Sequence, residues 1–257
     1  MTDNNRAAWA YSNTFYDYIE KGVLPSARAV VGLIADELRP VSVLDVGCGR
    51  GLWLKNWKEK GARDVMGVDG AYVDALRLHI ARDEFRPVDL SSSFALGRKF
   101  DLVQSLEVAE HLPPLSSVDF IASLVAHGDI IVFSAAVPGQ GGENHQNERP
   151  LSFWRSLFER HGFAPYDPIR PHLAHKREIE PWYRFNTLLY ANEAGRTRLP
   201  TSIAVTRIVP SEGIAEFGDL SWRLRRAVVS LLPRSAVDFI ARRRAQMIAA
   251  RLAQDAP

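Results

Sequence analysis

A glycine-rich turn after an apolar segment of β character carries the strongest chemical signal in the sequence. The segment 41–46 contains Asp45 and leads directly into Gly47, Gly49 and Gly51. Because glycine has no Cβ, a strand-to-helix turn of this kind lets a ligand come close to the backbone. The turn therefore predicts a site for a nucleotide-like cofactor.

The spacing of the glycines and one carboxylate narrow the choice of nucleotide. A nicotinamide-type fingerprint has a glycine at its sixth position, where this chain has Leu52. Asp69 ends the next apolar segment, twenty residues after Gly49, and a carboxylate there can accept hydrogen bonds from both hydroxyls of a ribose. These two features favour a nucleotide cofactor other than a nicotinamide dinucleotide.

Two later segments also run from apolar into polar residues. Asp89, at the end of the segment 85–89, is placed to meet an adenine amino group. Its alternative role is a turn acid or helix N-cap ahead of Ser91. The run 100–112 passes from apolar residues into a polar loop near Ser105.

Together the four segments resemble the class I S-adenosylmethionine-dependent methyltransferases, over about residues 40 to 192. The resemblance implies S-adenosyl-L-methionine as cofactor and S-adenosyl-L-homocysteine as product. It also implies cofactor contacts at the ends of four strands: Asp45, Gly47, Gly49 and Gly51 around the methionine part and the ribose edge, Asp69 on the ribose, Asp89 and Leu90 beside the adenine, and Ser105 to Glu107 beside the methionine ammonium group.

The elements that must position these residues alternate as a parallel sheet requires. The predicted strands are 41–46, 64–69, 85–89, 100–105, 129–136 and 186–191, and the predicted helices are 51–60, 71–82, 115–126 and 151–162. This pattern predicts an α/β fold with a doubly wound, mostly parallel sheet and helices on both faces. The resemblance implies seven strands with the last one antiparallel, the segment 163–169 and the strand 186–191 forming the closing hairpin.

The two ends of the chain depart from this alternation. Residues 6–38 predict amphipathic helices interrupted around Gly22 and Pro25 and stopped by Pro40. Near the other end, 202–209 is expected as a further strand, and 219–252 as two basic amphipathic helices divided by Pro233. The predicted parts are an N-terminal helical segment (1–39), a Rossmann-like methyltransferase domain (40–193) and a basic, mostly helical appendage (194–257).

A hydroxyl acceptor has to lose its proton during methyl transfer, so a general base is expected near the sulfonium. The loop after the 129–136 strand offers His145 as the first candidate, with Glu143, Asn144 and Glu148 to orient it or bind substrate. The alternative is that this polar run organises the loop and caps the helix that begins near residue 151.

A second polar cluster, Glu107, Glu110 and His111, is expected at the same rim, so Glu107 and His111 are further catalytic candidates. In the related methyltransferases a Glu-His pair here is often structural. The segment 181–186 can present Trp182 or Tyr183 to the acceptor, or these aromatic residues only pack.

Four side chains from these two loops could form an oxygen-rich site for a divalent ion: Glu107, Glu143, Asn144 and His145. Their spacing does not demand a metal, so no metal ligand is predicted.

Composition sets the wider limits. The chain of 257 residues is 46% hydrophobic and 24% charged, which suits one large globular domain with appendages. Its single Cys48 excludes an internal disulfide and a thiolate metal cluster, and no apolar run is long enough to span a bilayer. We therefore expect a cytoplasmic protein.

The net charge of +2 conceals an uneven distribution, because residues 221–252 hold eight Arg and one Asp. This basic segment allows a peripheral contact with an anionic membrane, self-association, or nucleic-acid binding. Nucleic acid is disfavoured, because the loop at Ser105 lacks the Asn/Asp-Pro-Pro-aromatic motif of adenine methyltransferases.

These features predict O-methylation of a small molecule, a sugar or related metabolite. The alternatives are a nucleic-acid methyltransferase and a regulatory protein that binds the cofactor without catalysis.

Overall fold

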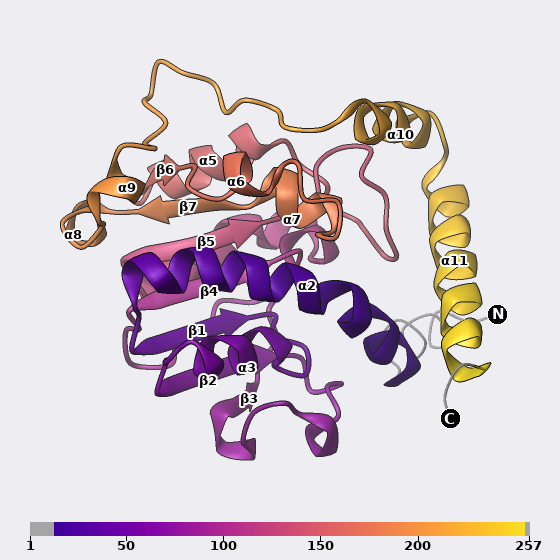
Figure 1. Cartoon of the computed structure of the whole chain (residues 1–257), viewed down its shortest axis with the longest axis horizontal. Coiled ribbons are helices and arrows are strands. Elements are labelled where there is room, and N and C mark those ends of the chain that lie inside the picture. The colour runs from indigo at the N-terminus through magenta and orange to yellow at the C-terminus, as the bar shows by residue number, and fades with distance from the viewer. Residues whose placement is uncertain (1–12, 255–257) are drawn as a thin grey trace.

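The fold is built on one seven-stranded sheet, whose strands lie side by side in Figure 1 with α2 and α3 in front of them. The structure is a computed structural model that describes residues 13–254. The strands, in chain order, are β1 (Ser42–Val46), β2 (Asp64–Asp69), β3 (Phe85–Pro87), β4 (Leu102–Leu106), β5 (Ile130–Ser134), β6 (Ala164–Tyr166) and β7 (Leu188–Ala191).

The strand order is β3-β2-β1-β4-β5-β7-β6, and only β7 runs antiparallel to its neighbours β5 and β6. The predicted doubly wound sheet and its closing hairpin are therefore confirmed. The order reverses between β1 and β4, and ligands of such sheets bind beyond the carboxyl ends of the strands at that reversal. The glycine turn that follows β1 lies at this point.

Two hydrophobic clusters cover the two faces of the sheet, and successive strand residues alternate between them. Val43 and Leu102 belong to the cluster under helices α2 (Asn13–Leu38) and α3 (Leu52–Glu59). Leu44 and Val103 belong to the cluster under α4 (Ser117–Ala126) and α5 (Leu151–Glu159). This period of two is the pattern of strands buried on both faces.

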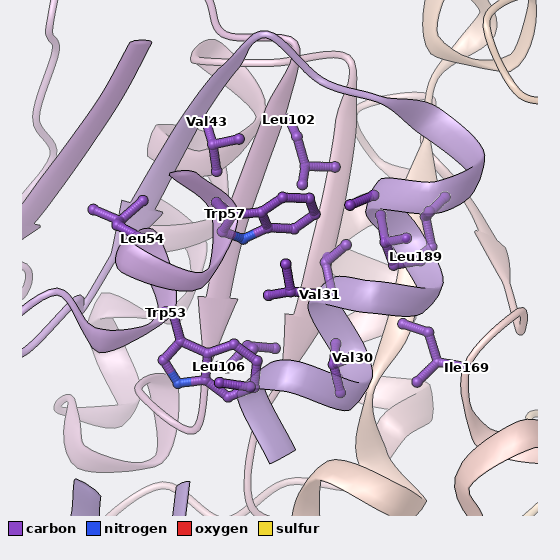
Figure 2. Packing of buried hydrophobic residues seen from close by; sticks show 14 of the residues in the cluster. Val30, Val31, Val43, Trp53, Leu54, Trp57, Leu102, Leu106, Ile169 and Leu189 are labelled. Atoms are coloured by element: carbon purple, nitrogen blue, oxygen red, sulfur yellow. The ribbon is translucent and has the colours of Figure 1, made fainter. Parts of the chain in front are cut away.

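Trp57 of α3 is the central side chain of the first cluster. Figure 2 shows its ring between Val31 of α2 and the strand residues Val43 and Leu102. The indole Nε1 donates a hydrogen bond to Gln104 Oε1 at 2.9 Å, so the buried polar atom is paired. Packing here fixes α3, and with it the end of the glycine turn.

The predicted helix 71–82 is wrong. The chain forms only two short 3₁₀ turns there, η1 (Ala75–Arg77) and η2 (Arg82–Glu84). The carboxylate of Asp74 accepts from the Leu76 backbone N–H and caps η1, and the chain then leaves helical geometry at Leu78. Ile80 is buried against the glycine turn, which an unbroken helix would not allow.

The predicted strand 202–209 is also wrong. Residues Thr201–Ala204 form the short helix α9, which follows Pro200. Only Arg207 makes an isolated bridge, to Tyr166 of β6. Proline favours the start of a helix, where its missing N–H has no partner to lose.

The expected break in the N-terminal helix is absent, because α2 runs through Gly22 and Pro25 without interruption. Val23, Ala27 and Val30 on its inner face are buried in the first cluster, and this packing outweighs the cost of an internal proline. The predicted start at residues 6–12 lies outside the described residues. The helix ends at Leu38, before Pro40, as expected.

Between β6 and β7 lie α6 (Arg170–Leu173) and α7 (Pro181–Asn186), and β7 leads into α8 (Glu193–Arg196). The C-terminal part then forms α10 (Leu220–Ser230) and α11 (Arg234–Gln254) on either side of Pro233, as predicted. In Figure 1 α11, in yellow, stands beside the N-terminal end of α2, and the two helices are in contact. Among residues 13–254, no helix has the length and apolar character needed to cross a membrane. The three-part division of the chain stays a prediction.

Candidate active site

The glycine turn adopts a backbone that other residues rarely reach. Gly47, Gly49 and Gly51 all have positive φ, at 84°, 54° and 82°. A Cβ on Gly47 would lie 2.3 Å from Cγ2 of Val108, and one on Gly51 would lie 2.9 Å from Ile80. The turn therefore needs glycine for its backbone angles and for the space above it.

Asp69, at the end of β2, holds this turn in place. Its Oδ2 accepts from the backbone N–H of Gly49 at 2.7 Å, and its Oδ1 accepts from the Gly70 N–H and from the Tyr72 hydroxyl. Burial raises the pKa of the carboxyl, and these three donors oppose the rise. The turn and the acid that follows it by twenty residues are thus in direct contact, and the ribose-binding role of Asp69 stays a prediction.

Asp45 lies beneath the same turn and is 2% exposed. Its Oδ2 has no hydrogen-bond partner among the described residues. Burial raises the pKa of Asp45 to about 7; the side chain of Gln104 lowers it, and the charge of Asp69 adds to the rise. An ammonium or sulfonium group above the turn would supply the missing partner.

The other predicted cofactor residues are placed less directly. Ser105 is buried, and its Oγ donates to the Val46 carbonyl at 2.8 Å, so this side chain joins β4 to β1. Asp89 is exposed and accepts from the backbone N–H and the hydroxyl of Ser91, which is the turn role considered above. Leu90 is buried in the second cluster.

Three residues that the sequence did not single out connect helix α2 to the glycine turn. Glu20 contacts the guanidinium of Arg50 at 3.7 Å and His79 Nε2 at 3.1 Å. The backbone N–H of His79 also donates to the Arg50 carbonyl. Because these positions are far apart in the sequence, no local pattern could have shown the contact.

On the side of the site where the methyl acceptor is expected (the acceptor side), Glu107 begins a series of hydrogen bonds. Its Oε2 accepts from Gln140 Nε2 at 2.6 Å, and Gln140 Oε1 accepts from Asn186 Nδ2 at the end of α7. Glu107 has φ of 57°, a strained angle for this residue type. Burial raises the pKa of its carboxyl. These hydrogen bonds connect three segments: the end of β4, the loop after β5 and the end of α7.

Glu110, His111 and His145 meet beside Glu107, in η3 (Ala109–His111) and the loop after β5. The two imidazole rings lie 4.9 Å apart, edge to face. Burial and then the charge of Glu107 raise the pKa of Glu110, and burial lowers the pKa of His111. The structure thus brings together the three predicted catalytic candidates, Glu107, His111 and His145.

The loop 137–148 owes its shape to Glu148. The Glu148 carboxylate accepts from the backbone N–H groups of Gly139 and Gly141 and contacts His145 Nδ1 at 2.9 Å. These donors lower the pKa of Glu148 against the effect of burial. Glu148 therefore orients His145.

The two C-terminal helices rest on this loop, a contact that the sequence did not indicate. Arg226 of α10 donates to the Pro138 carbonyl. On α11, Asp238 accepts from the Asn144 backbone N–H, and Arg242 donates to the Asn144 side chain. The apolar residues Leu224 and Val228 of α10, and Leu231 directly after it, are exposed. Self-association and membrane contact through α10 stay predictions.

Aromatic side chains from α7 line the inner side of the cluster. Tyr183 is buried, with its ring edge-on to Trp53 at 5.1 Å, and Trp182 is partly buried beside it. Burial, followed by the charges of Glu107 and Glu110, raises the pKa of Tyr183. Tyr183 is therefore a neutral neighbour of the acidic cluster, and the predicted aromatic rim packs against α3.

The sheet order is that of the class I S-adenosylmethionine-dependent methyltransferases, and the family model that matches the chain agrees with it. A family model described as methyltransferase domain matches residues 22–171, more than half of the chain, and the chain belongs to this family. The predicted family is thereby confirmed.

Individual relatives match over shorter stretches. The ubiquinone biosynthesis O-methyltransferase of Neisseria meningitidis is 33% identical over 107 residues, which is 38% of this chain and 45% of the relative. The enzyme of the same name from Acinetobacter baylyi is 36% identical over 102 residues, which is 36% of this chain and 42% of the relative. The chain thus matches less than half the length of these curated relatives.

Among solved structures, magnesium protoporphyrin IX methyltransferase from Synechocystis PCC 6803, with bound SAM, superposes with a TM-score of 0.51 at 22% identity. The match covers 75% of this chain and 92% of that one. At this identity the likeness concerns the fold alone.

Proposed function

We propose that this chain transfers a methyl group from S-adenosyl-L-methionine to a hydroxyl oxygen of a small molecule. The observation that carries the proposal is the junction of the glycine turn, Asp69 and the partnerless oxygen of Asp45 at the reversal of strand order. It offers a carboxylate for a ribose diol and a buried anion for the positive end of the cofactor.

The residues present suit this cofactor. Asp69 would hold the ribose, and Asp45 with the turn 47–51 would face the methionine part. The bound cofactor supplies a methyl group on a positively charged sulfur. The acceptor oxygen forms the new C–O bond while the C–S bond breaks and its electron pair returns to sulfur, so the chain's main task is to hold the two atoms in line.

The acceptor proton must leave, and the acceptor-side cluster supports this step. His111 and His145 meet there, and Glu107 is close enough to feel the charge of His145. Val108, next to Glu107, lies over Gly47 of the turn that would hold the sulfonium. In this proposal the cluster binds the acceptor hydroxyl and draws off its proton.

Names of relatives favour oxygen as the methylated atom, because the curated relatives include ubiquinone biosynthesis O-methyltransferases. The buried aromatic residues near the cluster suit a ring-bearing acceptor, whereas the polar loop suits a sugar. We therefore propose a hydroxylated small molecule of one of these two kinds, acted on in the cytoplasm.

Calorimetry with S-adenosyl-L-homocysteine tests the cofactor site, and transfer of labelled methyl groups to catechols and to sugars tests the reaction. Binding with labelled product from either acceptor class would support the proposal. Binding without transfer to any hydroxyl would favour a regulatory protein, and absence of binding would overturn the cofactor assignment.

A further inference from the structure

The cluster on the acceptor side has the composition of a metal centre. Glu110, His111 and His145 each offer one ligand atom, and these atoms all lie within 4.8 Å of one another. Two ligands bound to one ion at about 2.1 Å can be at most about 4.2 Å apart. A side-chain movement of under about 1 Å would therefore bring all three into coordination range.

Glu110 has an unusual environment for a carboxylate. It is 0% exposed, neither of its oxygens has a hydrogen-bond partner of good geometry among the described residues, and the polar groups that act on it are the Glu107 carboxyl and the Ala136 backbone. Oε1 of neighbouring Glu107 is also buried without a partner among residues 13–254. Buried carboxylates are normally paired, hydrogen-bonded or bound to a metal. A cation at this point would satisfy both acids.

The histidines are held as metal ligands usually are. His145 Nδ1 contacts Glu148 Oε1 at 2.9 Å, which leaves Nε2 of that ring for an ion. An outer partner of this kind fixes the orientation of a ligating imidazole. The His111 ring lies edge to face against His145 and is held by that contact.

The backbone around the cluster is strained in the way that functional sites often are. Glu107 and Asn144, which lie on either side of it, have φ of 57° and 58°. Among the described non-glycine residues only Arg39 shares a positive φ. Both angles persist because surrounding contacts impose them.

We infer that Glu110, His111 and His145 form a binding site for a divalent transition-metal ion such as Zn²⁺ or Mn²⁺. Two imidazoles and a carboxylate suit these ions better than Mg²⁺ or Ca²⁺, which prefer oxygen ligands alone. The set shares only His145 with the four residues considered from the sequence, because Glu110 and His111 take the place of Glu107, Glu143 and Asn144.

The ion also has a place in the proposed methyl transfer, and this part of the inference rests on the proposed function. A hydroxyl bound to a divalent ion loses its proton more readily. The acceptor proton would pass to water or to Glu107, and the resulting alkoxide or phenolate would attack the methyl carbon. In that arrangement His145 would act as a ligand of the ion and not as the general base.

The site is tested by metal titration without cofactor or acceptor, so its outcome is independent of any transfer activity. Chelator-treated protein is titrated with Mn²⁺, followed by the electron paramagnetic resonance of the free ion, and with Zn²⁺ against a coloured chelator. We expect one ion per chain. The variants His111→Ala and His145→Ala should each weaken binding at least tenfold, and the exposed His161→Ala should leave it unchanged.

Glu110→Gln keeps the shape of the buried side chain and should also weaken binding at least tenfold, with circular dichroism to confirm the fold. Glu148→Gln, which removes the charge that orients His145, should weaken it less. The inference is overturned if wild-type protein binds neither ion more tightly than the His111→Ala/His145→Ala double variant. If transfer is found and its rate survives metal depletion unchanged, the role in the reaction is overturned.

Discussion

The hydroxyl of Tyr72 donates a hydrogen bond to Asp69 Oδ1 at 2.5 Å, at the position where a ribose hydroxyl would bind. The other carboxylate oxygen is committed to the Gly49 N–H. Tyr72 is 48% exposed. If Asp69 holds the ribose as proposed, a ribose hydroxyl would have to displace this tyrosine hydroxyl.

Replacing this hydroxyl should strengthen cofactor binding. In Tyr72→Phe the ribose no longer competes with a hydrogen bond to a charged group, so we expect Kd to fall by about three- to tenfold, within the net worth of such bonds. Calorimetry with S-adenosyl-L-homocysteine measures the change. A weakening of more than threefold would mean that the hydroxyl contacts the cofactor instead.

Removing the carboxylate should have the opposite effect. Asp69→Ala should weaken cofactor binding by about 1.5–3 kcal/mol, or about ten- to a hundredfold in Kd. Asp64→Asn is the matched control, because Asp64 begins the same strand and pairs with Arg98 at its far end. Equal affinities for Asp69→Ala and the control would refute the ribose assignment.

Stability should depend on pH through Asp45. Burial raises the pKa of Asp45 to about 7, far above the usual value for an aspartate, so the folded state holds the proton more tightly than the unfolded state. The free energy of unfolding should therefore fall as pH rises from 4 to 7, by an amount on the order of 4 kcal/mol from this group.

The variant Asp45→Asn removes this dependence, and urea unfolding at pH 4 and pH 8 measures it. The free energy of unfolding of the variant minus that of the wild type should rise from pH 4 to pH 8. Asp89→Asn is the control: the pKa of Asp89 is lowered by Ser91, so its effect on stability should be constant above pH 5. A wild-type-minus-variant difference that does not change with pH would contradict the altered pKa of Asp45.

Because Val108 lies close over Gly47, the stability lost in Gly47→Ala should be partly restored by a second substitution at Val108. Gly47→Ala places a Cβ against Val108 and costs about 1–2 kcal/mol for the left-handed backbone alone. Thermal unfolding should show the loss, and Val108→Ala in the same chain should recover the part due to contact. Gly213→Ala, where a Cβ meets nothing within 4 Å, should be neutral. Failure of Val108→Ala to recover any stability would show that the two side chains do not collide.

Local spacing explains what the sequence could predict. The glycine turn and Asp69 are separated by one helix and one strand, so their meeting follows from the sheet alone. The strands were predicted to within a few residues because alternate positions face two cores. The helix 71–82 was not, because one side chain, Asp74, caps a short turn that periodicity does not reveal.

The acceptor side could be predicted only as a set of candidates. His111 and His145 lie on different loops, and their contact depends on Glu110, whose carbonyl accepts from the backbone N–H groups of Gln146 and Asn147. Likewise, the cover that α10 and α11 form over the loop depends on tertiary contacts at Arg226 and Asp238. Such long-range contacts leave no periodic pattern in the sequence.

The contact between α2 and α11 has a practical consequence for handling the protein. Glu20 on α2 contacts Arg50 in the glycine turn, and Arg242 on α11 donates to the Asn144 side chain, so each terminal helix touches one of the two loops of the candidate site. The imidazoles of a polyhistidine tag would compete with His111 and His145 for added ions. Metal titration therefore calls for a removable tag.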